Sequence, residues 1–205
     1  MSETTKNAAP TRGRPSISDV KRQRMRKDIA DIAKRLFQNE GYATVSMRRI
    51  AGEIGCSPMT LYKYYDAKID ILRTLWSDVF DELFKQLETM QKTDKTELQF
   101  LGATYVRYWL DHPEYYRLVF LADGVTQPDV SIFIDNPELV QRFGIFEEAI
   151  SNACSSPSKP DALKEKLDTF LCFLNGIAHN VITISDYPWP EPSKMVRMAV
   201  SAVTN

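Results

Sequence analysis

Cysteine and histidine are scarce in this chain of 205 residues, which has three cysteines and two histidines. Cys56, Cys154 and Cys172 lie far apart without paired spacing, so they predict reduced packing residues and not a disulfide framework or a metal cluster. His112 and His179 have no spacing to cysteines or carboxylates of the kind that builds a metal site or a nucleophilic triad. The sequence therefore predicts no metal, no cofactor and no enzymatic activity.

Long apolar runs and strand patterns are missing as well. No stretch of about 18 apolar residues is present to cross a membrane. The polar N-terminus lacks the apolar segment of a secretion signal, so we expect a cytoplasmic protein. Because no alternating strand pattern persists, and no glycine-rich phosphate loop follows a strand, we expect an all-α fold without a nucleotide site.

The charge is small in total but unevenly distributed. The net charge is −1, yet residues 1–68 hold 14 Lys or Arg against 7 Asp or Glu, a net +7, and residues 69–205 carry a net −8. A basic surface attracts phosphates through counterion release, and an acidic one is repelled from nucleic acid. The N-terminal third is therefore the candidate nucleic-acid face, with a merely solvated basic tail as the alternative.

Two short capped helices joined by a glycine turn are predicted within residues 45–65. Ser46 is suited to cap the first helix, and Gly55 supplies the turn. Ser57 is a second N-cap, and Pro58 follows it at the first helical position, where a missing amide costs nothing. This arrangement is the outline of a helix-turn-helix that reads DNA.

The second of these helices is predicted to expose a polar face. Leu61 and Tyr65 lie four residues apart and point inward. The side chains left outside, and so free to meet DNA, are Pro58, Met59, Thr60, Lys63 and Tyr64.

Over about residues 24–76 the chain resembles the DNA-binding domain of the TetR/AcrR family of bacterial transcriptional regulators. The matching positions are Gly41-Tyr42, Ser46, Ile50-Ala51, Gly55, Ser57, Leu61-Tyr62, Tyr64-Tyr65 and Lys68. The resemblance implies an N-terminal three-helix helix-turn-helix domain followed by a helical ligand-binding and dimerisation domain. Met59 departs from the pattern, because the family often has a small residue there, so a base preference cannot be carried over.

The same resemblance implies roles for single residues. Arg48, Thr60, Tyr64 and Lys68 are candidates for phosphate contacts, and Pro58, Met59, Thr60 and Lys63 lie nearest the base edges. Phosphate contacts position a protein on DNA, and base contacts give it specificity. Tyr62 has two interpretations, because its hydroxyl can reach a phosphate or its ring can simply belong to the core. With the two serine caps, these residues form the candidate DNA-binding set.

A basic arm precedes the first helix. Arg12-Gly13-Arg14-Pro15 resembles the core of an AT-hook, in which extended arginines enter a narrow minor groove. A soluble basic leader is the alternative. We expect residues 1–17 to form a disordered arm.

The helical pattern then predicts the domain plan. We expect a first helix over about residues 18–40, with residues 18–68 as the DNA-binding domain and residues 69–205 as the effector-binding and dimerisation domain. Further helices are expected over about 70–90, from an Asp94 and Glu97 capping box to near Asp111, and over 113–121 and 137–153. Two more follow the linker at 155–160, separated by a break at residues 187–190.

The penultimate helix has an apolar seam. Leu163, Leu167, Phe170, Leu174, Ile177, Val181 and Ile184 repeat at alternating spacings of four and three, the pattern with which a helix packs along another. A further apolar face needs more cover than the short last helix, with Met195 and Met198, provides. We therefore expect a homodimer through these two helices, as the resemblance to the family also implies.

The aromatic-rich middle of the chain is the candidate effector region. Most of its rings are expected to be core, and the family often holds a small apolar effector there. The candidate pocket residues are Phe84, Tyr105, Trp109, Phe120, Phe146, Asn175 and His179. Asn175, His179 and Thr183 form a polar line at helical spacing, for which satisfied core or interface polarity is favoured over effector binding.

The resulting hypothesis is a homodimeric repressor that a small-molecule effector releases from a palindromic operator. Release requires that the effector bind the DNA-incompetent form better. The alternative is a DNA-bound structural or protein-recruiting factor without effector control. The expected partners are thus double-stranded DNA, a second copy of the chain and an unknown effector, without a membrane.

Overall fold

The computed structural model describes residues 17–89, 97–134, 136–154 and 159–204, and these residues form helices with no strand among them. The helices are α1 (Ile17–Glu40), α2 (Met47–Ile54), α3 (Pro58–Leu61), α4 (Lys68–Glu88), α5 (Glu97–Asp111), α6 (Pro113–Phe120), α7 (Gln127–Ile134), α8 (Pro137–Arg142), α9 (Gly144–Ala153), α10 (Pro160–Thr183) and α11 (Pro192–Thr204). The expected all-α fold, with an N-terminal helix-turn-helix and a helical C-terminal domain, is confirmed.

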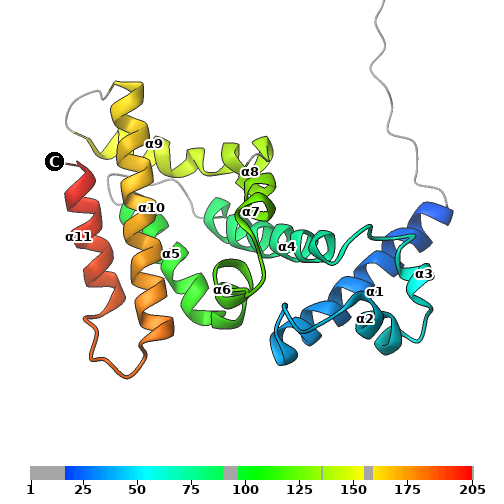
Figure 1. Cartoon of the computed structure of the whole chain (residues 1–205). Coiled ribbons are helices and arrows are strands. Elements are labelled where there is room, and N and C mark those ends of the chain that lie inside the picture. Colours follow the sequence, from blue (N-terminus) through cyan, green and yellow to red (C-terminus); the bar gives the residue numbers. More distant parts are fainter. Residues whose placement is uncertain (1–16, 90–96, 135, 155–158, 205) are drawn as a thin grey trace, which may run out of the picture.

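Two hydrophobic cores organise the chain, and α4 belongs to both. Its first half contributes Leu75 and Trp76 to a core built mainly by α1–α3. Its second half contributes Phe80 and Phe84 to the larger core of the C-terminal helices. Figure 1 shows α4 running from the group of α1–α3 into the body of the molecule. The two groups of helices therefore share one rigid element.

The C-terminal core is built by α5, α9, α10 and α11 around a close approach at Gly102. A Cβ atom added there would lie 2.9 Å from Cζ of Phe170 and 3.0 Å from Cγ1 of Val196. Both neighbours are fully buried. Glycine is therefore what allows α5 to pack closely against α10 and α11.

In the middle of the chain, one helix was not predicted and one predicted helix is broken in two. The sequence analysis did not predict α7, which begins after a cap in which the backbone N–H and the hydroxyl of Thr126 both donate to Asp129 Oδ2, at 2.9 and 2.7 Å. The expected helix over residues 137–153 is broken at Phe143, which ends α8 and precedes α9. The Phe143 ring packs edge-on against Phe84, with 4.9 Å between centroids. The expected cap residue Asp94 lies outside the described residues.

No helix within the described part of the chain combines the length and the apolar character needed to cross a membrane.

Candidate functional site

The α2–α3 segment has the capped geometry that the sequence predicts. The Ser46 hydroxyl accepts from the backbone N–H of Arg49 at 3.1 Å, and Gly55 ends α2 in the left-handed conformation with φ of 78°. The Ser57 hydroxyl accepts from the backbone N–H of Thr60 at 3.1 Å. Each helix start therefore has a donor satisfied by its own serine, which fixes the two helices about the glycine turn.

The exit of α3 is anchored to α1. Leu61 and Tyr65 are buried, as predicted, and the Tyr65 hydroxyl donates to the Arg26 carbonyl at 3.2 Å. The Arg26 guanidinium lies over the Tyr65 ring, 4.1 Å from its centroid, and donates to the carbonyl of Tyr64. Arg26 is thus a structural cation that positions α3.

Two further arginines of this region are held in ion pairs. Arg49 lies 2.8 Å from Glu40 and 2.7 Å from Glu53, and Arg35 lies 2.8 Å from Glu53. The Arg49 guanidinium lowers the pKa of the Glu53 carboxyl below its ordinary value by hydrogen bonding and by its charge. These pairs join α2 to α1, so their positive charge is partly neutralised within the domain.

Arg48 and Lys63, by contrast, are exposed, and the side chain of neither has an ion-pair or hydrogen-bond partner among the described residues. The sequence analysis named both for DNA contacts. Arg48 lies in α2 and Lys63 directly after α3, so the two uncommitted cations lie on either side of the glycine turn. An unpaired cation has no internal ion pair to lose when it approaches a phosphate, which favours this pair for the first contacts with nucleic acid.

Lys68 points into the domain. Its ammonium donates to the carbonyls of Tyr42 and Val45 at 2.6 and 2.8 Å and lies over the Tyr42 ring, 4.1 Å from its centroid. Burial lowers the pKa of Lys68 below its ordinary value. Lys68 therefore ties the start of α4 to the segment that precedes α2, and a phosphate contact of this residue would compete with these bonds.

Two large side chains, one within α3 and one directly after it, are exposed. Met59 is 73% exposed and Tyr62 is 47% exposed, whereas Tyr64 is half-buried. The Thr60 hydroxyl lies 2.9 Å from the Ser57 hydroxyl, so it is already engaged in the cap. Arg12 and Arg14 of the predicted arm lie outside the described residues.

Comparison with known proteins matches the helix-turn-helix region to bacterial transcriptional regulators. The model of the family "Bacterial regulatory proteins, tetR family" matches residues 29–75. An HTH-type transcriptional regulator of Staphylococcus aureus (strain MRSA252) is 34% identical over 99 residues, which cover 46% of this chain and 51% of the relative. Over residues 29–75 the chain is therefore similar to the tetR family of bacterial regulatory proteins. It spans about half the length of the curated relatives that it matches.

Solved TetR-family structures share the fold along most of the chain. A tetR-family transcriptional regulator from Streptomyces coelicolor has a TM-score of 0.62 at 15% identity, covering 88% of this chain and 79% of its own. MexZ, a repressor responsible for antibiotic resistance in Pseudomonas aeruginosa, has a TM-score of 0.60 at 20% identity, covering 89% of this chain and 96% of its own. At these identities the likeness shows the TetR fold alone.

A mainly apolar cavity of about 310 Å³ lies in the C-terminal domain. Three of the predicted pocket residues line it, namely Tyr105, Phe120 and Asn175. The structure places Phe84, Trp109 and Phe146 in the packed core, with 0% exposure, and His179 is exposed. Sequence analysis did not assign Trp76 and Phe80 of α4, or Val130 of the unpredicted α7, to the pocket.

One polar side chain of the cavity has a free donor. The Tyr105 hydroxyl donates to Asn175 Oδ1 at 2.8 Å. A tyrosine phenol is protonated at neutral pH, and burial raises the pKa of the Tyr105 phenol still further from it, so the hydroxyl is a donor. The Asn175 amide nitrogen makes no hydrogen bond within the described residues. A ligand in this cavity would therefore meet mainly apolar walls and the side-chain amide of Asn175.

Helix α6 connects this cavity to the helix-turn-helix domain. Val119 and Phe120 line the cavity, while Leu118, one residue earlier, packs in the N-terminal core. The Trp76 indole N–H of α4 donates to the Leu118 carbonyl at 3.0 Å. A shift of α6 at the cavity would thus also move Leu118, which contacts α4 and packs in the N-terminal core.

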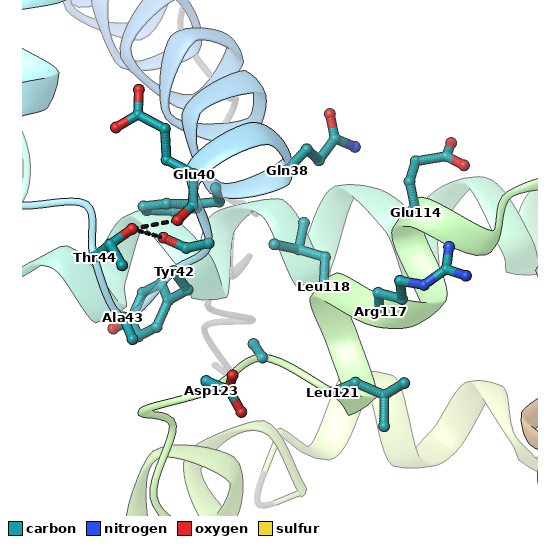
Figure 2. Close-up of a pocket in the computed structure, with 13 residues that line it drawn as sticks. Gln38, Glu40, Tyr42, Ala43, Thr44, Glu114, Arg117, Leu118, Leu121 and Asp123 are labelled. Carbon is teal, nitrogen blue, oxygen red and sulfur yellow. Dashed lines mark hydrogen bonds between the residues drawn. The ribbon is translucent and has the colours of Figure 1, made fainter. Parts of the chain in front are cut away.

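A second hollow lies at the junction of the two domains, between the α1–α2 turn and α6 (Figure 2). It has a volume of about 390 Å³, with Tyr42 and Thr44 on one side and Arg117, Leu118 and Leu121 on the other. Beside it, Lys34 Nζ lies 2.7 Å from the Tyr115 hydroxyl and 4.1 Å from the centroid of its ring. The junction thus combines direct contacts with unfilled space, which leaves room for α6 to move against α1.

The last two helices lie side by side at one edge of the molecule (Figure 1). Phe170 and Leu174 of the predicted dimer seam are fully buried within the protomer, and Leu163, Leu167 and Ile177 pack partly against the same core. Val181 and Met195 are half-buried, and Met198 is 74% exposed. Phe173, which lies off the predicted seam, is 42% exposed. Most of the seam therefore serves the protomer core, and a different face of α10 is free.

Proposed function

We propose that this protein is a TetR-family transcriptional repressor that binds DNA sequence-specifically. The observation that carries the proposal is the capped α2–α3 unit, which combines exposed apolar side chains with the uncommitted cations Arg48 and Lys63. Apolar groups and hydrogen-bonding groups at the start of a recognition helix read base edges, and flanking cations hold phosphates. The names of the curated relatives, HTH-type transcriptional regulators, support the same function.

The test is selection of the purified protein against randomised duplex DNA, followed by binding of the selected site at several salt concentrations. We expect a palindromic site. Lys63→Ala removes one phosphate contact per protomer, so in a dimer it should reduce the slope of log K against log salt by about 2. Arg35→Ala is the matched control, because it removes the same charge from an arginine that is paired with Glu53.

The outcomes separate the alternatives. Enrichment of one palindrome with a slope change for Lys63→Ala alone supports the proposal. Equal changes for the two variants would mean that general positive charge governs binding. Enrichment of no sequence would favour the second candidate, a structural or protein-recruiting DNA factor without effector control.

The homodimer is proposed to form through the free faces of α10 and α11. Phe173 is the large exposed apolar side chain of this face of α10, and a Cβ atom added at Gly176, three residues later, would meet nothing within 4 Å in the protomer. A small residue beside an exposed ring permits close approach of a second helix. Two-fold pairing would present two helix-turn-helix units to a palindromic site.

The effector is proposed to be a small apolar molecule with one hydrogen-bond acceptor, bound in the cavity of about 310 Å³. Apolar walls supply most of the affinity, and the free Asn175 N–H selects the acceptor. Acetophenone and ethylbenzene are matched probes, because they have similar shapes and only acetophenone carries a carbonyl. We expect acetophenone to raise the melting temperature more than ethylbenzene does, and Asn175→Leu to abolish the difference.

The cavity suggests how an effector could release DNA. A ligand against Phe120 would displace α6, and the hydrogen bond from Trp76 to the Leu118 carbonyl would pass the displacement to α4. Release follows only if the displaced form binds the ligand more tightly than the DNA-bound form does. Addition of an effector to the DNA complex should therefore lower DNA affinity, and unchanged affinity with every bound ligand would favour the factor without effector control.

A further inference from the structure

The most exposed large apolar side chain in the described part of α1–α3 is Met59. It is 73% exposed, compared with 51% for Val20 and 47% for Tyr62. A single exposed apolar side chain is ordinary on a protein surface. Met59 differs from such a side chain in its position, because it is the second residue of α3, the helix proposed above to read base edges.

At the start of α3, the Met59 side chain is flexible and has no bonded partner among the described residues, whereas its neighbours are bonded to each other or rigid. The hydroxyls of Ser57 and Thr60 lie 2.9 Å apart and contact each other. Pro58 is exposed but rigid, and its ring has no polar group. The Met59 side chain is unbranched and polarisable, so it can adapt to a surface that approaches it.

The chemistry of methionine limits what it can read. A thioether has no hydrogen-bond donor and is only a weak acceptor, so it cannot distinguish bases through their polar edges. The apolar feature of a base pair in the major groove is the C5-methyl group of thymine. Arg48 and Lys63 flank α3 with positive charge that is free for the phosphates on either side.

We propose that Met59 is a specificity-determining residue that contacts the C5-methyl group of a thymine in each half-site. It thereby selects a T·A pair at one position. This inference rests on the proposed function and deepens it, because it names the base feature that this chain reads. Apolar contact with the methyl group excludes water from both surfaces, which gives the preference its free energy.

The test compares wild-type protein with Met59→Ala and Met59→Gln in selections from randomised duplex DNA. Because Met59 is exposed, both variants should keep the helix content and unfolding midpoint of the wild type. We expect one thymine in each half-site of the wild-type site, loss of preference at that position alone with Met59→Ala, and a changed base preference there with Met59→Gln, whose amide reads adenine.

Replacing that thymine by uracil then removes only the methyl group. For wild-type protein we expect affinity to fall about fourfold for one half-site and about fifteenfold for both, from the free energy of burying one methyl group. For Met59→Ala the same replacement should have no effect. A uracil effect that is equal in both proteins, or base preferences that do not respond to Met59, would overturn the assignment. If the wild type itself enriches no sequence, it is the proposed function that fails.

Discussion

Replacing Gly102 by alanine should lower the free energy of unfolding, although alanine is the better helix former. The new Cβ atom would lie 2.9 Å from Phe170, 3.0 Å from Val196 and 3.3 Å from Leu174. These three neighbours are all fully buried, so they have little room to withdraw. Overpacking of this kind costs about 1–3 kcal/mol.

The helix propensity of alanine opposes this cost. Alanine in place of glycine inside a helix contributes about 0.8–1 kcal/mol. The expected net effect of Gly102→Ala is therefore a loss of about 1 kcal/mol. Gly52→Ala is the matched control, because the same change within α2 meets nothing within 4 Å and should stabilise the protein by about 0.8–1 kcal/mol.

The assay is urea unfolding followed by circular dichroism at one protein concentration. Both variants receive the same gain in helix propensity, so the difference between them, about 2 kcal/mol, measures the steric cost at Gly102. If the two variants gain stability equally, α5 does not approach α10 and α11 as closely as the structure shows, and the account of the C-terminal core would be refuted.

Four further variants probe single side chains. Lys68→Met should destabilise the protein by about 1.5–3 kcal/mol, because the carbonyls of Tyr42 and Val45 lose a charged donor; an unchanged urea midpoint would contradict this anchoring role. Trp76→Phe should cost about 1–3 kcal/mol by leaving the Leu118 carbonyl without its indole donor, as measured by thermal unfolding, and wild-type stability would argue against a tight junction. Phe173→Glu should give monomers of normal helix content in sedimentation, whereas Leu174→Ala should lower the stability of the protomer by about 2–5 kcal/mol; a Phe173→Glu protein that remains dimeric would exclude this face of α10.

The parts that could be predicted from the sequence are those decided by neighbouring residues. A serine cap acts on an amide three residues away, so Ser46 and Ser57 could be assigned to helix starts directly. The left-handed turn at Gly55 is equally local. Helix α7 had such a signal too, because Thr126 is followed three residues later by Asp129, although no helix was predicted there.

The parts that could not be predicted depend on distant partners. The carbonyls that hold Lys68 are more than twenty residues away in sequence, so its inward orientation leaves no local trace. The apolar repeat of α10 shows that a face is covered, but not whether the same protomer or a second copy covers it. Phe170 and Leu174 pack on α5 of the same protomer. Regular apolar spacing does not distinguish such packing within the protomer from packing against a second copy.

The shared helix α4 determines where this protein can be divided. Ile71, Leu72, Leu75 and Trp76 complete the core of α1–α3, although they follow the helix-turn-helix of residues 45–65. A fragment that stops at residue 68 would leave that core open on one side. A chimaera that transplants this DNA-reading unit onto another regulatory body must therefore carry the chain through Trp76, and must also supply a substitute for Leu118, which α6 contributes to the same core.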